Sequence, residues 1–160
     1  MSAFHADITS GLPSEATTTK VPKTALMGRS MDQAPPTPSI SPCFIVSDVT
    51  ASISFYVNKL GFSVEYSDPP DDPFFAIVRR DGAMIFLKAE GGIDPVPNNT
   101  RHRHLRLDAY VSAPDPDALY ADFSRRGAQF SEALCDTHDG LRGFEITDPD
   151  GLVLFFGRPR

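Results

Sequence analysis

The fold is decided by residues 41–60, SPCFIVSDVTASISFYVNKL, which predict a short strand followed by a helix. Residues 44–46 are apolar and β-prone, and Asp48 offers a carboxylate to the unpaired N–H groups of a helix start. The residues after Asp48 repeat an apolar side chain at helical spacing, at Ile53, Tyr56, Val57 and Leu60. Gly61 then suits the left-handed conformation with which many helices end.

A second copy of this pattern occupies residues 108–130, DAYVSAPDPDALYADFSRRGAQF. Asp115 is the expected N-cap, Pro116 the first helical residue and Gly127 the stop. The buried stripe of this helix would consist of Leu119, Tyr120 and Phe123. Two copies in one chain make an internal repeat, so we expect two modules of similar structure.

Each copy continues into alternating, β-prone segments that are separated by turn signals. The turn between the last two strands is Asp81-Gly82 in the first module and Asp-Pro-Asp-Gly, residues 148–151, in the second. The predicted fold class is therefore α+β, with two βαβββ modules in one chain. The expected strands are 42–47, 62–66, 74–79 and 83–89 around a helix at 49–60, and 105–111, 128–133, 141–147 and 152–156 around a helix at 116–126.

Residues 1–39 differ in composition from the rest, because they are rich in Ser, Thr and Pro and show little apolar periodicity. Such a segment cannot bury enough surface to offset the entropy lost on ordering, so we expect a disordered tail. Module one then occupies residues 40–90, a linker 91–100 and module two 101–158. Met31 lies just before the folded region and is an alternative start to Met1.

Charge and cysteine content narrow the class of partner. The net charge of −6 argues against a duplex nucleic-acid surface and against an anionic membrane patch. No run approaches the roughly 18 apolar residues of a membrane span. Cys43 and Cys135 lie far apart without metal-type spacing, and we expect free thiols in a reducing cytoplasm. A small-molecule ligand is the partner that fits these constraints.

The segments SDVTASISFYVNKLGF, residues 47–62, and DPDGLVLFF, residues 148–156, together with the doubled βαβββ unit, resemble the vicinal oxygen chelate superfamily. This superfamily includes glyoxalases, bleomycin-resistance proteins and extradiol dioxygenases, and the likeness covers about residues 40–158. The resemblance implies that each sheet curls into a half-barrel with its helix on the outer face. It also implies a ligand cavity between paired modules, or between the subunits of a homodimer.

Metal-dependent members of the superfamily hold an ion with His, Gln or Glu on the first and last strands of each module. By the resemblance, the matching positions here are Ser41, Phe86, Arg106 and Phe155. Phenylalanine has no donor atom for a divalent ion, serine is a poor ligand and arginine repels a cation. We therefore expect neither a metal nor any other cofactor. In this respect the chain resembles the bleomycin-resistance-like members of the superfamily, which bind their ligand without a metal.

An alternative metal set remains open. His102 and His104 share one face of the expected strand, and Asp108 continues that face by strand alternation. Two histidines and a carboxylate could bind iron or zinc in an enzyme of the glyoxalase or dioxygenase type. The flanking arginines favour a solvated basic edge instead.

Strand alternation also predicts which side chains line the cavity. The more uniformly apolar faces, which include Phe44, Val46, Leu107, Val111, Ile85, Leu87, Leu154 and Phe156, should pack under the helices. The mixed faces should line a pocket of the aromatic and polar kind that binds small molecules. The candidate ligand-binding residues are Ser41, Cys43, Tyr66, Met84, Phe86, Arg106, Asp108, Tyr110 and Phe155.

The function that these residues favour is sequestration of a small molecule, with a role in antibiotic resistance implied by the resemblance. Asp108 would favour a ligand with a cationic group, and aromatic stacking would supply affinity. We identify no catalytic residue from the sequence. A third possibility is that Phe86 and Phe155 fill the barrel themselves, which would leave a module that serves association only.

Overall fold

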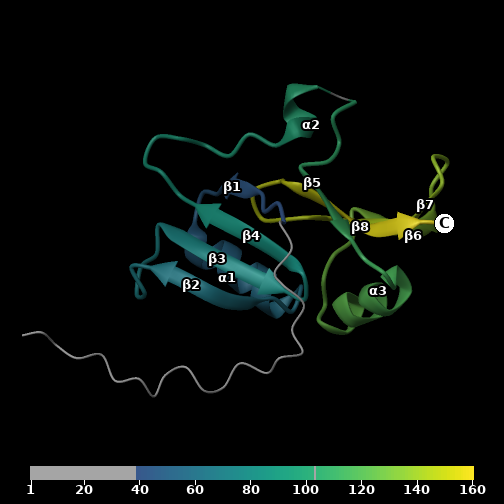
Figure 1. The fold of residues 1–160 in the computed structure, drawn as a ribbon. Helices are drawn as coiled ribbons and strands as arrows, with labels where there is room; N and C mark the ends of the chain where they lie inside the picture. Colours follow the sequence, from purple (N-terminus) through teal and green to yellow (C-terminus); the bar gives the residue numbers. More distant parts are fainter. Residues whose placement is uncertain (1–38, 103) are drawn as a thin grey trace, which may run out of the picture. The chain divides into compact units, whose positions relative to one another are not determined.

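Both copies of the repeat fold as a four-stranded sheet with one long helix packed against it (Figure 1). The computed structural model describes residues 39–102 and 104–160, so the expected tail lies outside the described residues except for its last one. Module one consists of β1 (Cys43–Ile45), α1 (Val49–Asn58), β2 (Ser63–Asp68), β3 (Phe75–Arg80) and β4 (Ala83–Lys88). Module two consists of β5 (Ala109–Ser112), α3 (Pro116–Arg125), β6 (Glu132–Asp136), β7 (Leu141–Thr147) and β8 (Val153–Pro159), and the short α2 (Asn98–Arg101) precedes it.

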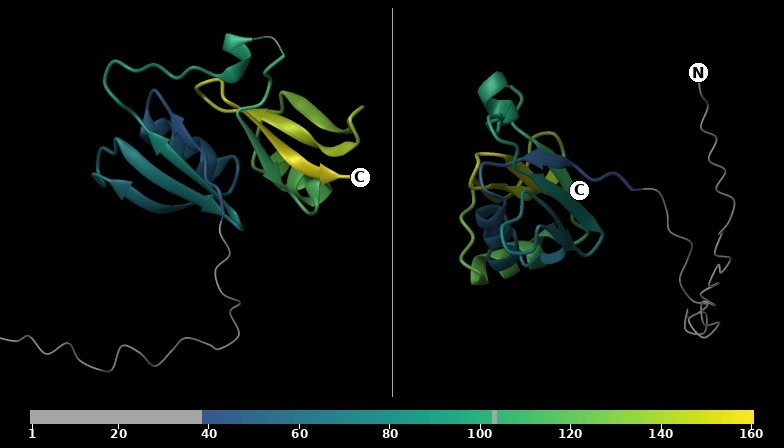
Figure 2. Two further views of the ribbon diagram at one scale, coloured as in Figure 1. Left: turned by 45° about the horizontal axis from the view of Figure 1, so that its top comes forward. Right: turned by 90° about the vertical axis from the view of Figure 1, so that its left-hand side faces the viewer.

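The two sheets have the same topology. Their strand orders are β1-β4-β3-β2 and β5-β8-β7-β6. In each sheet the first strand pairs in parallel with the last strand, and the remaining pairs are antiparallel (Figure 2). This arrangement confirms the predicted α+β class with two βαβββ modules.

The expected helix signals have the predicted geometry. Asp48 and Asp115 each accept a hydrogen bond from the backbone N–H three residues further on, at 2.9 and 3.0 Å. Gly61 and Gly127 follow the two helices with φ of 66° and 71°, which L side chains rarely adopt. Local sequence therefore determines where both helices begin and where the chain turns away from them.

The core lies between each helix and its sheet. Of the residues predicted to face the helices, six are almost fully buried: Phe44, Val46, Ile85, Leu87, Leu154 and Phe156. Leu107 and Val111 are only half-buried. In module two the core is largely aromatic, because Phe123, Phe144 and Phe156 contact one another with ring centroids 5.2–5.7 Å apart.

Three predicted segments of secondary structure were wrong. The strand expected at 105–111 begins only at Ala109, because the backbone N–H of Leu105 bonds to His102 and the carboxylate of Asp108 takes backbone donors. The strand expected at 128–133 begins only at Glu132 and continues to Asp136 as β6. The linker contains α2, which the sequence did not predict, because its four residues are too few to show helical periodicity.

The contact between the modules, which we call the seam, includes two polar contacts. At the first contact, the Tyr56 hydroxyl donates to Asp148 at 3.1 Å, and the N–H of Ser47 donates to Asp150 at 3.0 Å. At the second contact, the Arg80 guanidinium donates to Asp122 at 2.9 Å. Each contact joins a helix of one module to the last turn of the other, so the two contacts are related by the repeat.

Candidate functional site

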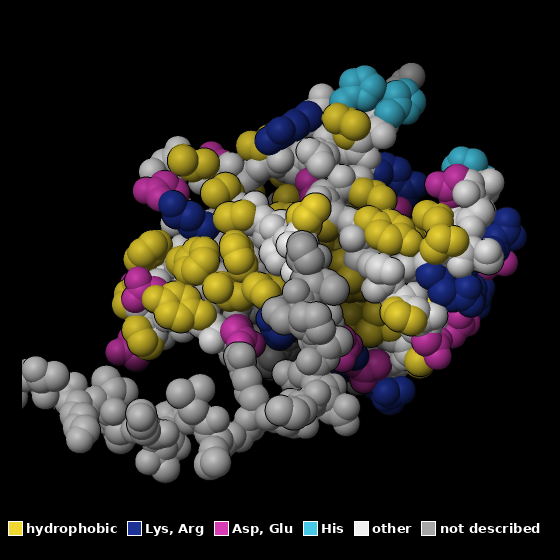
Figure 3. Space-filling view, in the orientation of Figure 1, with side chains coloured by type: hydrophobic (Ala, Val, Ile, Leu, Met, Phe, Trp, Pro, Cys, Tyr) yellow, Lys and Arg dark blue, Asp and Glu magenta, His cyan; other side chains and the backbone are white. Residues whose placement is uncertain are grey.

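The face of the module-one sheet opposite α1, which we call its open face, carries a row of three aromatic side chains. Tyr66, Phe75 and Phe86 come from three strands. The ring centroid of Phe75 lies 6.2 Å from that of Tyr66 and 6.0 Å from that of Phe86. The Tyr66 side chain is 51% exposed. Figure 3 shows apolar side chains gathered over these strands. The row is therefore an accessible aromatic surface of the kind on which a planar ligand can stack.

The open face of the module-two sheet is arranged differently, because its central aromatic residue is covered. Phe155 is only 4% exposed, and its ring lies against Gly143 and Gly157, where any Cβ would collide with it. Tyr110 stacks on the Phe155 ring at a centroid distance of 5.5 Å and donates its hydroxyl to the carbonyl of Gly157. Phe155 thus fills its own sheet face, as the third possibility expected, whereas Phe86 is half-exposed.

An ion pair lies beside Phe155. The Arg106 guanidinium donates to the carboxylate of Glu145 at 2.5 Å. The Arg106 side chain is 59% exposed, whereas that of Glu145 is 11% exposed. The hydrogen bond that Arg106 donates to Glu145 raises the pKa of Arg106 above its usual value, so the guanidinium stays charged. A buried carboxylate is therefore neutralised here by a cation that solvent can reach.

This ion pair lines a cavity of about 620 Å³, which we call the module-two cavity, together with Phe155, Cys135 and Leu141. Its charged lining residues include one arginine, Arg106, and three carboxylates, Glu132, Asp139 and Glu145, and His104 and His138 line it as well. The excess of negative charge favours a cationic group over an anionic one.

Asp108 has a structural role in this fold. Its Oδ1 accepts the backbone N–H of Asn98 and its Oδ2 accepts that of Val153, both at 2.8 Å. Each carboxylate oxygen thus accepts a hydrogen bond from a backbone N–H, and together they connect the linker to β8.

The alternative metal set is not assembled. The rings of His102 and His104 have centroids 5.2 Å apart, but Asp108 directs both oxygens to backbone N–H groups. Among residues 39–102 and 104–160, no three His, Cys, Asp or Glu side chains are placed to hold a metal ion.

Eight of the nine predicted lining residues are distributed over three places, and Ser41 lies outside them. Tyr66, Met84 and Phe86 belong to the open face of module one, where Cys43 on β1 is the register partner of Phe86. Cys43 also lines a cavity of about 400 Å³ that it shares with Asp108. Arg106 and Phe155 line the module-two cavity, beside the stacked Tyr110, and Ser41 lies half-buried before β1.

The sequence analysis missed two residues of these surfaces. Phe75 completes the aromatic row, and strand alternation in residues 74–79 could have placed it there, since it shares its parity with Ile77 rather than with buried Ala76. Glu145 interrupts the apolar interior of β7, and a charged residue flanked by Phe144 and Ile146 was the available signal.

Sequence comparison decides the family. The sequence model described as Glyoxalase/Bleomycin resistance protein/Dioxygenase superfamily matches residues 39–156. The chain belongs to this superfamily. The resemblance inferred from the two motifs and the repeat is thereby confirmed, and no curated protein sequence matches the chain significantly.

Solved structures of the superfamily share the fold at low sequence identity. TioX from Micromonospora sp. ML1 is 18% identical with a TM-score of 0.61, covering 78% of this chain and 100% of its own. A bleomycin-binding protein from Streptomyces verticillus, complexed with copper(II)-bleomycin, is 23% identical with a TM-score of 0.55, covering 79% and 100%. A glyoxalase/bleomycin resistance protein/dioxygenase from Alicyclobacillus acidocaldarius is 19% identical with a TM-score of 0.62, covering 79% and 95%.

The positions that the resemblance matches to the metal ligands of the superfamily do not fit a metal ion in this chain. Phe86 and Phe155 provide no donor atom, and the Arg106 guanidinium places a positive charge at the third position, bonded to Glu145. No chemistry that depends on a bound metal is therefore assigned to these residues.

Proposed function

We propose that the protein binds a small organic molecule on the open faces of its sheets and sequesters it without metal. The observation that carries this proposal is the accessible row of Tyr66, Phe75 and Phe86. A sheet face that served only as core would have buried these rings, since burial of aromatic surface is strongly favourable. That a bleomycin-binding protein of similar fold holds bleomycin supports a small-molecule ligand here.

We infer that the ligand carries a cationic group, with Glu145 as its partner. Arg106 now neutralises this carboxylate from an exposed position, and a ligand ammonium or guanidinium that displaced Arg106 would keep the buried Glu145 paired while the Arg106 guanidinium moved into solvent. The aromatic part of the ligand would stack on the row in module one.

We further propose a homodimer, because each open face presents apolar side chains to solvent. Tyr66 on module one, and Tyr110 and the cavity-lining Leu105 on module two, are among the large hydrophobic residues exposed by 46–52%. Exposed apolar patches of this kind mark binding surfaces. A second copy would cover them and enclose the ligand between sheets.

Cys43 and Cys135 are both free thiols, which supports a cytoplasmic location.

The test is calorimetric titration of the full chain with bleomycin, aromatic amines and aromatic diols. We expect at least one cationic compound to bind and Phe86→Ala to weaken it severely. Ile85→Val is the matched control, because Ile85 is the buried neighbour on the opposite face of β4. Sedimentation of the same protein gives its oligomeric state. A dimer that binds none of these compounds would favour an association module over a sequestering protein.

Metal content gives an independent check. We expect the purified protein to hold no stoichiometric zinc, iron, manganese or nickel, and a chelator to leave its melting temperature unchanged, since no bound ion would stabilise the folded state. One tightly held ion per chain that is lost in His104→Ala would instead support the metal-dependent enzyme.

A further inference from the structure

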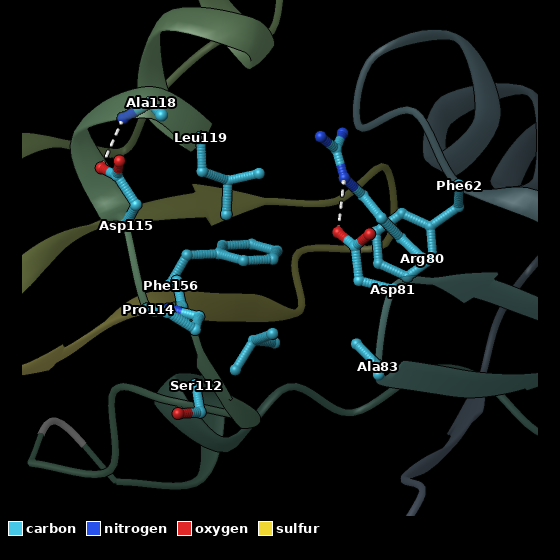
Figure 4. A pocket seen from close by; sticks show the side chains of 13 residues that line it. Phe62, Arg80, Asp81, Ala83, Ser112, Pro114, Asp115, Ala118, Leu119 and Phe156 are labelled. Atoms are coloured by element: carbon cyan, nitrogen blue, oxygen red, sulfur yellow. Dashed lines mark hydrogen bonds and ion pairs between the residues drawn. The ribbon is translucent and has the colours of Figure 1, made fainter. Parts of the chain in front are cut away.

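A third cavity, of about 570 Å³, lies at the seam on the helix side of both sheets (Figure 4). Module one contributes Phe62, Ala83 and the turn at residues 80–82. Module two contributes Phe156, the segment at residues 111–115, and Ala118 and Leu119 of α3. None of the nine residues predicted to bind the ligand lines this seam cavity, so it is separate from the open faces.

The walls of the seam cavity are apolar and largely rigid. Phe62 and Phe156 are 4% and 1% exposed and belong to the core, while Val111 and Leu119 pack against that core. In Figure 4 the side chains of Phe156 and Leu119 point toward those of Phe62 and Ala83 across the cavity. A space of this size with such walls falls within the range of small-molecule pockets.

The mouth of the seam cavity carries negative charge. Asp81 has a side chain that is 90% exposed, and Asp115 lies on the opposite wall, where it caps α3 through one oxygen. The cation at the same mouth, Arg80, donates from its terminal nitrogens to Asp122 and to the carbonyl of Leu60, and its Nε lies 3.7 Å from the exposed Asp81 carboxylate. The lining therefore combines an apolar interior with two carboxylates at the opening.

We propose that the seam cavity binds a hydrophobic amine. Its aromatic or branched aliphatic part lies between Phe62 and Phe156, and its ammonium lies at the mouth with Asp81 and Asp115. Because the walls come from both modules, bound amine contacts both and raises the stability of the folded chain by mass action. This site is additional to the ligand site on the open faces.

The experiment uses 1-naphthylmethylamine as probe, with neutral 1-naphthylmethanol and anionic 1-naphthoate as matched analogues, titrated into the full chain by calorimetry. We expect the amine to bind with higher affinity than the alcohol, and the alcohol with higher affinity than the carboxylate. Asp81→Asn should reduce the preference for the amine by roughly two- to fivefold, since the carboxylate is exposed and screened. Equal affinity for all three compounds overturns the proposal.

Two blocking variants locate the probe. Ala83→Leu fills the cavity from module one and Ala118→Leu, on the exposed side of α3, fills it from module two. Both should abolish amine binding, whereas Ala51→Leu, on the exposed start of α1, should leave it unchanged. If Ala83→Leu does not fold, Ala118→Leu decides the result. Amine binding that survives a folded blocking variant overturns the proposal.

Phe86→Ala separates this site from the proposed function. The seam cavity predicts that the variant binds the amine normally, even if it loses every ligand of the open face. Loss of the amine in Phe86→Ala, with binding retained in Ala118→Leu, would assign the probe to the open face and overturn the seam proposal alone.

Discussion

The open faces of the two modules are built on the same repeat and use their aromatic residues in opposite ways. In module one, Phe86 stands in an accessible row with Tyr66 and Phe75. In module two, the equivalent Phe155 lies on two glycines beneath Tyr110 and is buried. The fourth residue after the turn glycine is phenylalanine in both modules. The neighbouring side chains determine whether its ring is accessible to solvent or buried. Module two adds an ion pair, Arg106 with Glu145, to its open face.

The strongest test of this difference is truncation of the two equivalent phenylalanines. Phe155→Ala should lower the free energy of unfolding by about 3–5 kcal/mol, because it removes a fully packed ring. Phe86→Ala should cost about 1–2 kcal/mol, since one side of its ring already lacks packing partners. Urea unfolding measures both, with Leu154→Ala as the buried control beneath α3. Equal losses for the two phenylalanines would remove the distinction between the faces.

Asp148 and Asp122, one at each seam contact, have pKa values that are shifted in opposite directions. Burial raises the pKa of Asp148 to about 6, although hydrogen bonds from the backbone and from Tyr56 act in the other direction. Burial also acts to raise the pKa of Asp122, but hydrogen bonds and charge from Arg80 and Arg126 outweigh it and lower that pKa. One contact of the seam thus favours a protonated carboxyl and the other an ionised one.

Asp148→Asn tests the sign. A raised pKa means that the folded chain binds more protons than the unfolded chain between the usual carboxyl value and about pH 6. The free energy of unfolding of the wild type, minus that of Asp148→Asn, should therefore be largest at pH 4. This difference should fall by up to about 3 kcal/mol as the pH rises past 6. Urea unfolding at pH 4, 5, 6 and 7.5 gives the profile. A difference between wild type and Asp148→Asn that does not vary with pH would contradict the shift.

The ion pair of module two gives a smaller effect. Arg106→Ala leaves Glu145 without its cation, but water reaches the site that the exposed side chain vacates, so we expect a loss of about 1–2 kcal/mol. Adding Glu145→Gln should recover part of that loss, because the buried charge disappears with its partner. A double-mutant cycle by urea unfolding measures the coupling. Additive losses would mean that the pair contributes no interaction of its own.

The smallest effect is expected outside the modules. Removal of residues 1–30 should change the free energy of unfolding by about 0.5 kcal/mol or less, as for changes remote from a packed core. Thermal unfolding of the shortened chain, with and without the naphthylmethylamine probe, measures it. A drop of several degrees would assign a stabilising role to this segment and would show that residues 39–160 are not sufficient.

What could be predicted from the sequence was local. The caps at Asp48 and Asp115 and the stops at Gly61 and Gly127 depend on residues within one turn of each other, so spacing alone identified them. The repeat and strand alternation then gave the topology and most of the core. Burial of Phe155 depends instead on glycines of two strands, and the start of β5 depends on the bond between Asp108 and Val153, 45 residues away. Contacts of that range leave no periodic signal.

The two seam contacts also determine which halves can recognise each other. Tyr56 and Asp122 occupy equivalent helix positions, 66 residues apart as are Gly61 and Gly127, yet one meets a carboxylate and the other a guanidinium. Two copies of module two would bring Asp122 against the carboxylates of the turn at 148–151, and like charges would repel. The two halves of the repeat are thus complementary as one of each, whereas two copies of module two are not. If the chain were cut in the linker, we expect the module-two fragment to associate with module one and not with a copy of itself.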